Sequence, residues 1–200
     1  MSQSQAAPLV AAGPPKRAAA LPPDERRQMI VRATLPLLLE NGEMVTTRQI
    51  AEAAGIAEGT IFRVFADKDE LIAAAVDQAL DSAPLEHALA GIDLSQPFEN
   101  CVFRAVQILQ RRVVDIWRLS SSVGTRFQEH ARRPVSDIDA LVALFTSKEE
   151  HLSVEPVMAA RLLRAFTLSM THPMLTGEAT PPAMIVELFL HGICARDEPC

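Results

Sequence analysis

The sequence is poor in aromatic residues and cysteines. It contains no tyrosine, one tryptophan and eight phenylalanines, so aromatic residues make up only 4% of the chain. The three cysteines, Cys101, Cys194 and Cys200, lack the close spacing of zinc ligands, and an odd number cannot all pair within one chain. This usage favours a reducing compartment over the disulfide framework of a small secreted domain.

Long apolar segments are also absent. No apolar stretch approaches the roughly 18 residues of a transmembrane helix, and the N-terminus lacks a charged start followed by an apolar run. We therefore expect neither a membrane span nor a signal peptide, and we expect a cytoplasmic location.

The common catalytic signatures are missing. No HxH, HExxH or CxxC spacing, glycine-rich phosphate loop or nucleophile elbow occurs. Cys101 with a distant histidine remains the enzymatic alternative, although a buried structural cysteine is more common. We expect no enzymatic activity, no metal and no cofactor. The histidines are scattered at positions His87, His130, His151, His172 and His191.

What the chain does contain is apolar sequence in helical periods. Its 200 residues are 48% hydrophobic and 22% charged, which predicts a globular protein of one or two domains. Residues 1–21 are rich in Ala, Pro, Ser and Gln and predict a disordered arm. In this arm Lys16 and Arg17 either follow a DNA backbone or are ordinary solvated charges.

The helical periods predict an all-α fold. The first helix begins near Pro23, ends at Asn41-Gly42, and contains Pro36, which predicts a kink or an early break. Another amphipathic helix covers 68–80. Pro84 ends this helix or begins the next connection, and the segment around 91–97 is expected to be a turn. Further helices are expected at about 98–119, with an interruption at 120–124, and at 126–131, 136–151, 155–170 and 182–195.

Two short helices joined by a sharp turn are expected between Thr46 and Lys68. Ile50 and Ala54 lie on one helical face, as do Ala57 and Ile61, so the pair can share a small core. Gly55 between them can take the left-handed conformation that ends a helix. Thr46 followed by Gln49 fits a capping box, with Thr47 as the alternative cap. This pattern predicts a helix-turn-helix.

The same segment carries a more specific pattern of Thr, Ile-Ala, Ala-Gly, Gly-Thr, aromatic, Phe and Lys residues. Its members are Thr46, Thr47, Ile50, Ala51, Ala54, Gly55, Gly59, Thr60, Phe62, Phe65, Lys68 and Leu71. By these residues the stretch from Asp24 to Leu80 resembles the DNA-binding domain of the TetR family of bacterial transcription regulators. Beyond residue 80 the resemblance is limited to length and helical character.

Three residues depart from the family pattern. Ala57 stands where a serine usually caps the second helix, Phe62 where a tyrosine is common, and Val64 where a histidine or tyrosine is common. These departures imply a weaker or shifted set of phosphate contacts.

The second helix of a helix-turn-helix enters the major groove by its N-terminal residues. Arg63 is the best candidate base reader, because a guanidinium pairs bidentately with guanine, and Thr60 suits a phosphate or a thymine methyl. Arg48 and Lys68 are placed to contact phosphates or groove edges; the alternative for both is an ordinary solvated face. The full set of predicted DNA contacts is Thr46, Thr47, Arg48, Glu58, Gly59, Thr60, Phe62, Arg63 and Lys68.

The charge balance does not favour DNA binding. Residues 1–80 contain eight basic and ten acidic residues, a net charge of −2, and the whole chain carries −6. DNA-binding domains are usually basic. We therefore expect the basic residues to be segregated on one face and non-specific affinity to be weak and salt-dependent.

The resemblance implies two functions for residues 81–200. The last two helices are apolar over most of their surface, and in the TetR family the corresponding pair forms a four-helix dimer interface, here with Met158, Leu162, Phe166, Met184 and Leu188. Burial of both helices within one chain is the alternative. A bundle of this kind can also hold a small molecule, and the candidate ligand-binding residues are Phe103, Val106, Gln110, Trp117, Phe127, Phe145 and Met170.

Together these observations predict an arm at 1–21, a three-helix DNA-binding domain at 22–80 and a helical ligand-binding and dimerisation domain at 81–200. The expected function is a homodimeric regulator bound to a palindromic operator, a repressor released by an unidentified small molecule. The alternative is a helical ligand-binding or adaptor protein that kept the fold without operator binding.

Overall fold

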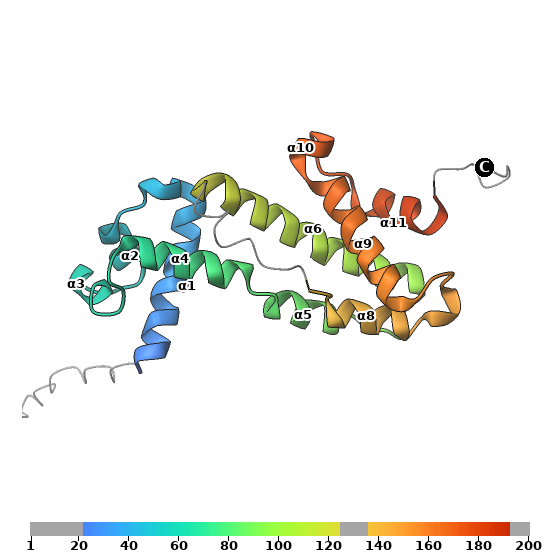
Figure 1. Cartoon of the computed structure of the whole chain (residues 1–200), viewed down its shortest axis with the longest axis horizontal. Helices are drawn as coiled ribbons and strands as arrows, with labels where there is room; N and C mark the ends of the chain where they lie inside the picture. Colours follow the sequence, from blue (N-terminus) through green and yellow to red (C-terminus); the bar gives the residue numbers. More distant parts are fainter. Residues whose placement is uncertain (1–21, 125–135, 193–200) are drawn as a thin grey trace, which may run out of the picture.

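The computed structural model of the chain describes residues 22–124 and 136–192 (Figure 1). Within these two ranges all regular structure is helical and no strand occurs, which confirms the all-α prediction. No helix in them is long and apolar enough to cross a bilayer. The predicted arm at 1–21, the predicted helix at 126–131 with Phe127, and Cys194 and Cys200 lie outside the described residues.

The N-terminal part of the molecule contains four α-helices and one short 3-10 helix. They are α1 (Pro23–Asn41), η1 (Gly42–Met44), α2 (Thr47–Ala53), α3 (Glu58–Ile61) and α4 (Lys68–Leu80). α1 continues through Pro36, so an early break there is not observed. The predicted helix at 68–80 is confirmed.

The C-terminal part is a bundle built on one long helix. Its elements are α5 (Ala83–Ala90), α6 (Phe98–Val123), α8 (Asp139–Thr146), η2 (Glu149–His151), α9 (Pro156–Thr171), α10 (Pro173–Thr176) and α11 (Pro182–His191). Figure 1 shows α6 extending from the N-terminal helices to the far end of this bundle, with α9 and α11 on one side of it.

The described residues form two hydrophobic cores, and α6 contributes to both. The N-terminal core joins α1, α2, α3 and α4 around residues such as Ile30, Ile50 and Ile61. Leu119 and Val123, from the last turns of α6, are buried in the same core. The C-terminal core joins α5, α6, α8, α9 and α11. A shift of α6 would therefore change the packing of both cores.

Several predicted helix bounds are corrected by the structure. The interruption predicted at 120–124 is wrong, because α6 continues to Val123, where Leu119 and Val123 are drawn into the N-terminal core. The helix expected at 136–151 is shorter and begins at Asp139, with only the 3-10 turn η2 at its end. α5 and α10 were not predicted. In α5 Pro84 occupies the first turn, where a proline is compatible with a helix.

α1 ends against α6 at a close backbone contact. Gly42 has φ +57°, and a Cβ built on it would lie 2.7 Å from the carbonyl oxygen of Ser122. Gly124 has the same φ, but a Cβ there meets nothing within 4 Å. The contact at Gly42 therefore requires a glycine for two separate reasons, backbone conformation and space.

We predict that Gly42→Ala is more destabilising than Gly124→Ala. Both changes carry the strain of a positive φ, and only the first forces a methyl group against the backbone of α6. The extra loss in the free energy of unfolding should be about 1–3 kcal/mol, measured by urea denaturation. Equal losses for the two variants would show that α1 and α6 do not pack this closely.

Candidate nucleic-acid interface

The N-terminus of α2 is fixed by a reciprocal cap. The hydroxyl of Thr46 accepts the backbone N–H of Gln49 at 3.2 Å, and the Gln49 side chain accepts the backbone N–H of Thr46 at 2.8 Å. The predicted capping box is confirmed, with Thr46 rather than Thr47 as the cap. It satisfies two backbone donors at the point where the chain enters the helix-turn-helix.

The turn and the second helix follow the expected pattern. Gly55 has φ +66°, which confirms the predicted left-handed conformation. α3 comprises four residues and is followed by tight turns to Val64. Its N-cap residue, Ala57, makes no side-chain cap bond, so the predicted loss of this cap is confirmed. A helix of one turn without a cap needs contacts from elsewhere to hold it in place.

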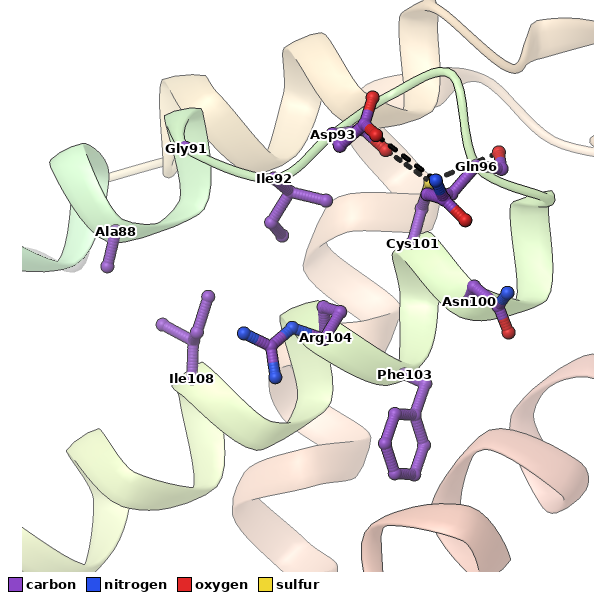
Figure 2. A pocket seen from close by; sticks show the side chains of 10 residues that line it. All are labelled: Ala88, Gly91, Ile92, Asp93, Gln96, Asn100, Cys101, Phe103, Arg104 and Ile108. Atoms are coloured by element: carbon purple, nitrogen blue, oxygen red, sulfur yellow. Dashed lines mark hydrogen bonds between the residues drawn. The ribbon is translucent and has the colours of Figure 1, made fainter.

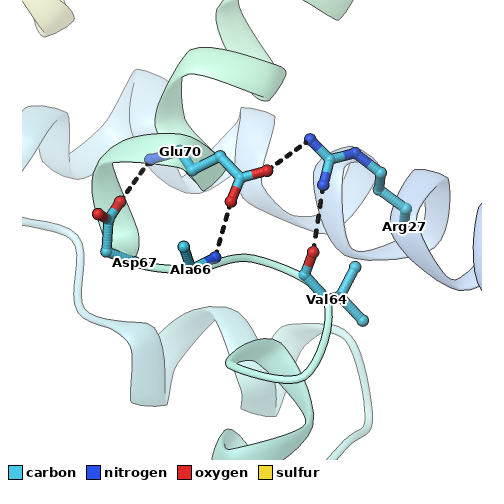
Figure 3. Close-up of polar contacts among 5 residues, drawn as sticks. All are labelled: Arg27, Val64, Ala66, Asp67 and Glu70. Atoms are coloured by element: carbon cyan, nitrogen blue, oxygen red, sulfur yellow. Dashed lines mark hydrogen bonds and ion pairs between the residues drawn. The ribbon is translucent and has the colours of Figure 1, made fainter.

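Arg27 of α1 supplies such contacts (Figure 3). Its guanidinium donates to the carbonyl oxygen of Val64 at 3.2 Å and to Oε1 of Glu70 at 3.1 Å, and it lies 4.2 Å from the centre of the Phe65 ring. Glu70, on α4, also accepts the backbone N–H of Ala66 at 2.7 Å. This Arg27 cluster, comprising Arg27, Val64, Phe65, Ala66 and Glu70, joins α1 and α4 to the segment that follows α3.

The ionisation of Glu70 depends on the same contacts. The hydrogen bond from the Ala66 backbone, followed by the hydrogen bond from Arg27, lowers the pKa of the Glu70 carboxyl below its ordinary value. Both contacts stabilise the charged carboxylate.

α3 and the turn after it expose most of their residues to solvent, while the last residue of α3 is anchored in the core. Ile61 is fully buried in the N-terminal core and Thr60 is half-buried, whereas Glu58, Gly59 and Arg63 are exposed and Phe62 is 51% exposed. The side chains of Arg63 and of Arg48 on α2 have no hydrogen-bond or ion-pair partner among the described residues. These two guanidinium groups are available to a ligand.

Two further residues predicted to contact DNA, Thr47 and Lys68, form side-chain hydrogen bonds within the protein. The Thr47 hydroxyl donates to Oε1 of Glu58, which ties the start of α2 to the start of α3. The Lys68 ammonium donates to the carbonyl oxygen of Glu43 at 2.7 Å, linking α4 to η1. The ammonium of Lys68 has two donors left for another acceptor.

The comparison with known families decides what this domain is. Residues 30–75 match the family described as bacterial regulatory proteins of the TetR family. The N-terminal domain belongs to the TetR family. The helix-turn-helix of this TetR-family domain is therefore α2 and α3, with α1 and α4 as its supports.

Curated relatives match the chain over part of their length. The nucleoid occlusion factors SlmA of Actinobacillus pleuropneumoniae and Haemophilus ducreyi are each 29% identical to it over 110 residues. For the first, the match covers 54% of this chain and 52% of the relative. The chain thus spans about half the length of the curated relatives it matches.

Solved structures share the fold over most of the chain. A TetR transcriptional regulator from Streptomyces coelicolor has a TM-score of 0.54 and 19% identity, covering 83% of this chain and 97% of that one. The TetR-like regulator LfrR from Mycobacterium smegmatis, solved in complex with proflavine, has a TM-score of 0.51 and 19% identity, covering 85% and 98%. At these identities the likeness shows the fold.

The candidate ligand-binding residues in the described part of the chain lie in different surroundings. Val106 and Phe145 are fully buried in the C-terminal core, and Met170 packs against it. Gln110 donates to the hydroxyl of Thr171 at 3.1 Å and to the carbonyl of Thr180 at 2.8 Å. Trp117 lies edge-on to the ring of His172, with centroids 6.5 Å apart.

Phe103 lines a pocket of about 470 Å³ at the α5–α6 connection (Figure 2). The polar groups of this pocket mostly hold the connection itself. The Asp93 carboxylate accepts from Ser95 and Gln96, which lowers its pKa, and the buried Cys101 thiol lies 3.5 Å from the carbonyl oxygen of Gln96. Arg104, which also lines the pocket, donates to Oε1 of Gln107 at 3.0 Å.

A second pocket, of about 440 Å³, lies between the α4–α5 connection, α6 and α9. Its apolar wall includes Leu80, Leu85, Leu109, Val113, Ile116 and Leu168, and its charged residues are Asp81, Glu86, Arg112, Asp137 and Arg164. We call it the α4–α6–α9 pocket. None of the seven predicted ligand residues lines it. The described residues contain no cluster of His, Cys, Asp or Glu suited to a metal ion.

The predicted dimer residues divide into an exposed and a packed group. Met158 and Leu162 on α9 are 46% and 47% exposed, and Met184 on α11 is 54% exposed. We call these three residues the α9–α11 face. Phe166 packs against Phe189, with ring centroids 6.4 Å apart, and Leu188 is half-buried.

Sequence reasoning missed the Arg27 cluster and both arginines of the α4–α6–α9 pocket. Arg27 lies 37 and 43 residues from Val64 and Glu70, so no local pattern links them. A signal did exist for Arg112, which follows Leu109 by three residues and precedes Ile116 by four, at the edge of an apolar stripe.

We predict that Glu70→Gln destabilises the protein in a pH-dependent way. Because the folded-state pKa of Glu70 is lowered, its carboxylate adds stability above its unfolded-state pKa, and this stability is lost as pH falls through the folded-state pKa. Urea denaturation should show the variant less stable at neutral pH, with the difference vanishing in acid.

The matched control is Glu40→Gln, at an exposed position of α1 with no hydrogen-bond or ion-pair partner in the described part of the chain. It should be near neutral at every pH. A pH-independent difference for Glu70→Gln would show that the carboxylate charge does not hold the Arg27 cluster together.

Proposed function

We propose that the protein is a dimeric, sequence-specific DNA-binding transcriptional regulator, a repressor whose DNA affinity is lowered by a small molecule bound in the C-terminal domain. The observation that carries this proposal is the exposed surface of α3 and the turn after it, with Phe62 and Arg63 exposed and Ile61 anchored in the core. A helix held in this way can enter a major groove without rearranging. The proposed location is the cytoplasm, and the proposed role is not enzymatic.

On DNA, the residues of the helix-turn-helix have different tasks. Arg63 reads a guanine through a bidentate pair, and Glu58, held by the Thr47 hydroxyl, accepts a hydrogen bond from a cytosine amine. Arg48 contacts a phosphate and carries no sequence information. Lys68 contributes a phosphate contact with the donors that Glu43 leaves free.

Dimerisation and ligand binding complete the proposal. The α9–α11 face is apolar and exposed in the single chain, and a second copy would cover it. A symmetric dimer presents two α3 helices to half-sites about one DNA turn apart. The fold that this chain shares with LfrR binds proflavine in that protein, which supports a small-molecule site here as well.

The adaptor alternative is favoured by one observation, the acidity of the N-terminal domain. A carboxylate, Glu58, lies exposed on the proposed reading surface, and residues 1–80 carry a net charge of −2. Such a surface repels phosphates unless Arg48 and Arg63 dominate locally. DNA binding measured directly separates the two functions.

We predict specific binding to one duplex among those tiling the DNA around the protein's own gene, measured by fluorescence anisotropy with excess unrelated DNA. Arg63→Ala should cost about 1–3 kcal/mol at the specific site and leave non-specific binding nearly unchanged. Arg48→Ala should weaken binding to all duplexes alike and reduce the salt slope by about one.

Anisotropy that is the same for every duplex, or unaffected by either substitution, would favour the adaptor. Arg32→Ala, at an exposed position of α1 outside the helix-turn-helix, is the control and should leave DNA affinity unchanged.

We also predict that Leu162→Glu disrupts the dimer. A charge in the centre of the α9–α11 face would have to be buried between the two copies without a partner. Sedimentation velocity should show a folded monomer for this variant and a dimer for Leu94→Glu, which changes a leucine that is 38% exposed in the α5–α6 connection. If both variants remain dimeric, the interface lies elsewhere.

A further inference from the structure

The acidic groups around the α4–α6–α9 pocket are committed to the protein itself. Oε1 and Oε2 of Glu86 accept the backbone N–H groups of Asp139 and Ala140, at 3.0 and 2.8 Å, and so cap the start of α8. Both carboxylate oxygens of Asp137 accept from Arg161 at 2.8 Å, which lowers the pKa of Asp137. Each of these four carboxylate oxygens already accepts a hydrogen bond from the protein.

Among the described residues, the two arginines that line the pocket hydrogen-bond to backbone carbonyls. Arg112 donates through Nη2 to the carbonyl oxygen of Asp81 at 2.9 Å, and Arg164 donates through Nη1 to that of Ser136 at 2.6 Å. The Asp81 carboxylate itself accepts the backbone N–H of Ala83 at 3.1 Å. Within the described ranges no carboxylate forms an ion pair with either lining guanidinium.

A guanidinium has five N–H donors, so most of those on Arg112 and Arg164 are unused by the described residues. Arg112 is also partly desolvated, and this burial lowers its pKa, although Asp115 and Asp81 act in the opposite direction. A charge removed from water attracts an opposite charge more strongly than one on the surface. The pocket thus combines an apolar wall with cationic donors in need of acceptors.

We propose that the α4–α6–α9 pocket binds an organic anion, a carboxylate or other oxyanion attached to an apolar body, through Arg112 and Arg164. This inference rests on the proposed function and names the chemical class of its effector. The bidentate geometry of a guanidinium matches an oxyanion, and Leu109, Val113 and Ile116 cover the apolar part of the ligand. Of the three carboxylates that line the pocket, those of Glu86 and Asp137 have both oxygens hydrogen-bonded to protein donors.

Arg112 connects the proposed anion site to the DNA-binding domain. Asp81, whose carbonyl oxygen Arg112 holds, is the C-cap residue of α4, the helix that begins directly after the helix-turn-helix. An anion that is hydrogen-bonded to Arg112 competes with the carbonyl oxygen of Asp81 for the guanidinium. Arg112 lies on α6, whose residues Leu119 and Val123 are buried in the N-terminal core. Ligand binding thus acts on two connections to the DNA-binding domain at once.

The test compares two probes with the same ten-carbon chain, decanoate and decyltrimethylammonium, by isothermal titration calorimetry on the full-length protein. Decanoate should bind at least about tenfold more tightly than the cation, because a charge-assisted bond is worth about 1.5–3 kcal/mol. Equal affinities for the two probes, or no binding of decanoate, would overturn the proposal.

Substitutions of Arg112 and Arg164 test whether these two residues bind the anion. Arg112→Gln and Arg164→Gln should each weaken decanoate binding about tenfold, and Arg112→Lys should be intermediate. The control Arg111→Gln changes an exposed neighbour on α6 that does not line the pocket, and should bind as the wild type does. Thermal melting without ligand establishes that each variant folds. Unchanged decanoate affinity in folded Arg112→Gln and Arg164→Gln would place the anion elsewhere and overturn the proposal.

The DNA titration distinguishes this inference from the proposed function. Decanoate that binds through Arg112 without lowering DNA affinity supports the anion site and contradicts ligand-controlled repression. Specific DNA binding by a protein that does not bind decanoate contradicts the anion site and leaves the DNA-binding role intact.

Discussion

The orientation of α3 depends on the guanidinium of Arg27. A single helical turn whose N-cap is Ala57 has neither the length nor the cap to be stable alone. Arg27 fixes the chain directly after it, by donating to the Val64 carbonyl and to Glu70 while lying over the Phe65 ring. Because α1 and α4 contact each other as well, the proposed reading surface is held from two sides. A DNA reader needs this rigidity, since its side chains must meet base edges in a fixed register.

Local structure could be predicted from the sequence wherever neighbouring residues decide it. The capping box of Thr46, the left-handed Gly55 and the helix at 68–80 depend on residues within a few positions of one another. The end of α6 could not be predicted in this way. Serines at 120–122 favour a break, but burial of Leu119 and Val123 against α1 and α4 overrides this local preference.

The candidate site could be predicted in part, for the same reason. Helical periodicity identified buried faces, and Val106 and Phe145 are indeed in the core, but periodicity cannot distinguish a core from a cavity wall. Whether a pocket exists depends on how helices far apart in sequence meet. Arg112 and Arg164, 52 positions apart, become neighbours of one pocket only through the packing of α6 and α9.

In vitro selection from a library of random duplexes shows whether a folded dimer reads a DNA sequence through α3, as we propose. The account predicts enrichment of one two-fold symmetric site with half-sites about one helical turn apart, because a symmetric dimer presents two copies of the same reading surface. A folded dimer that enriches no sequence above the starting library would contradict it.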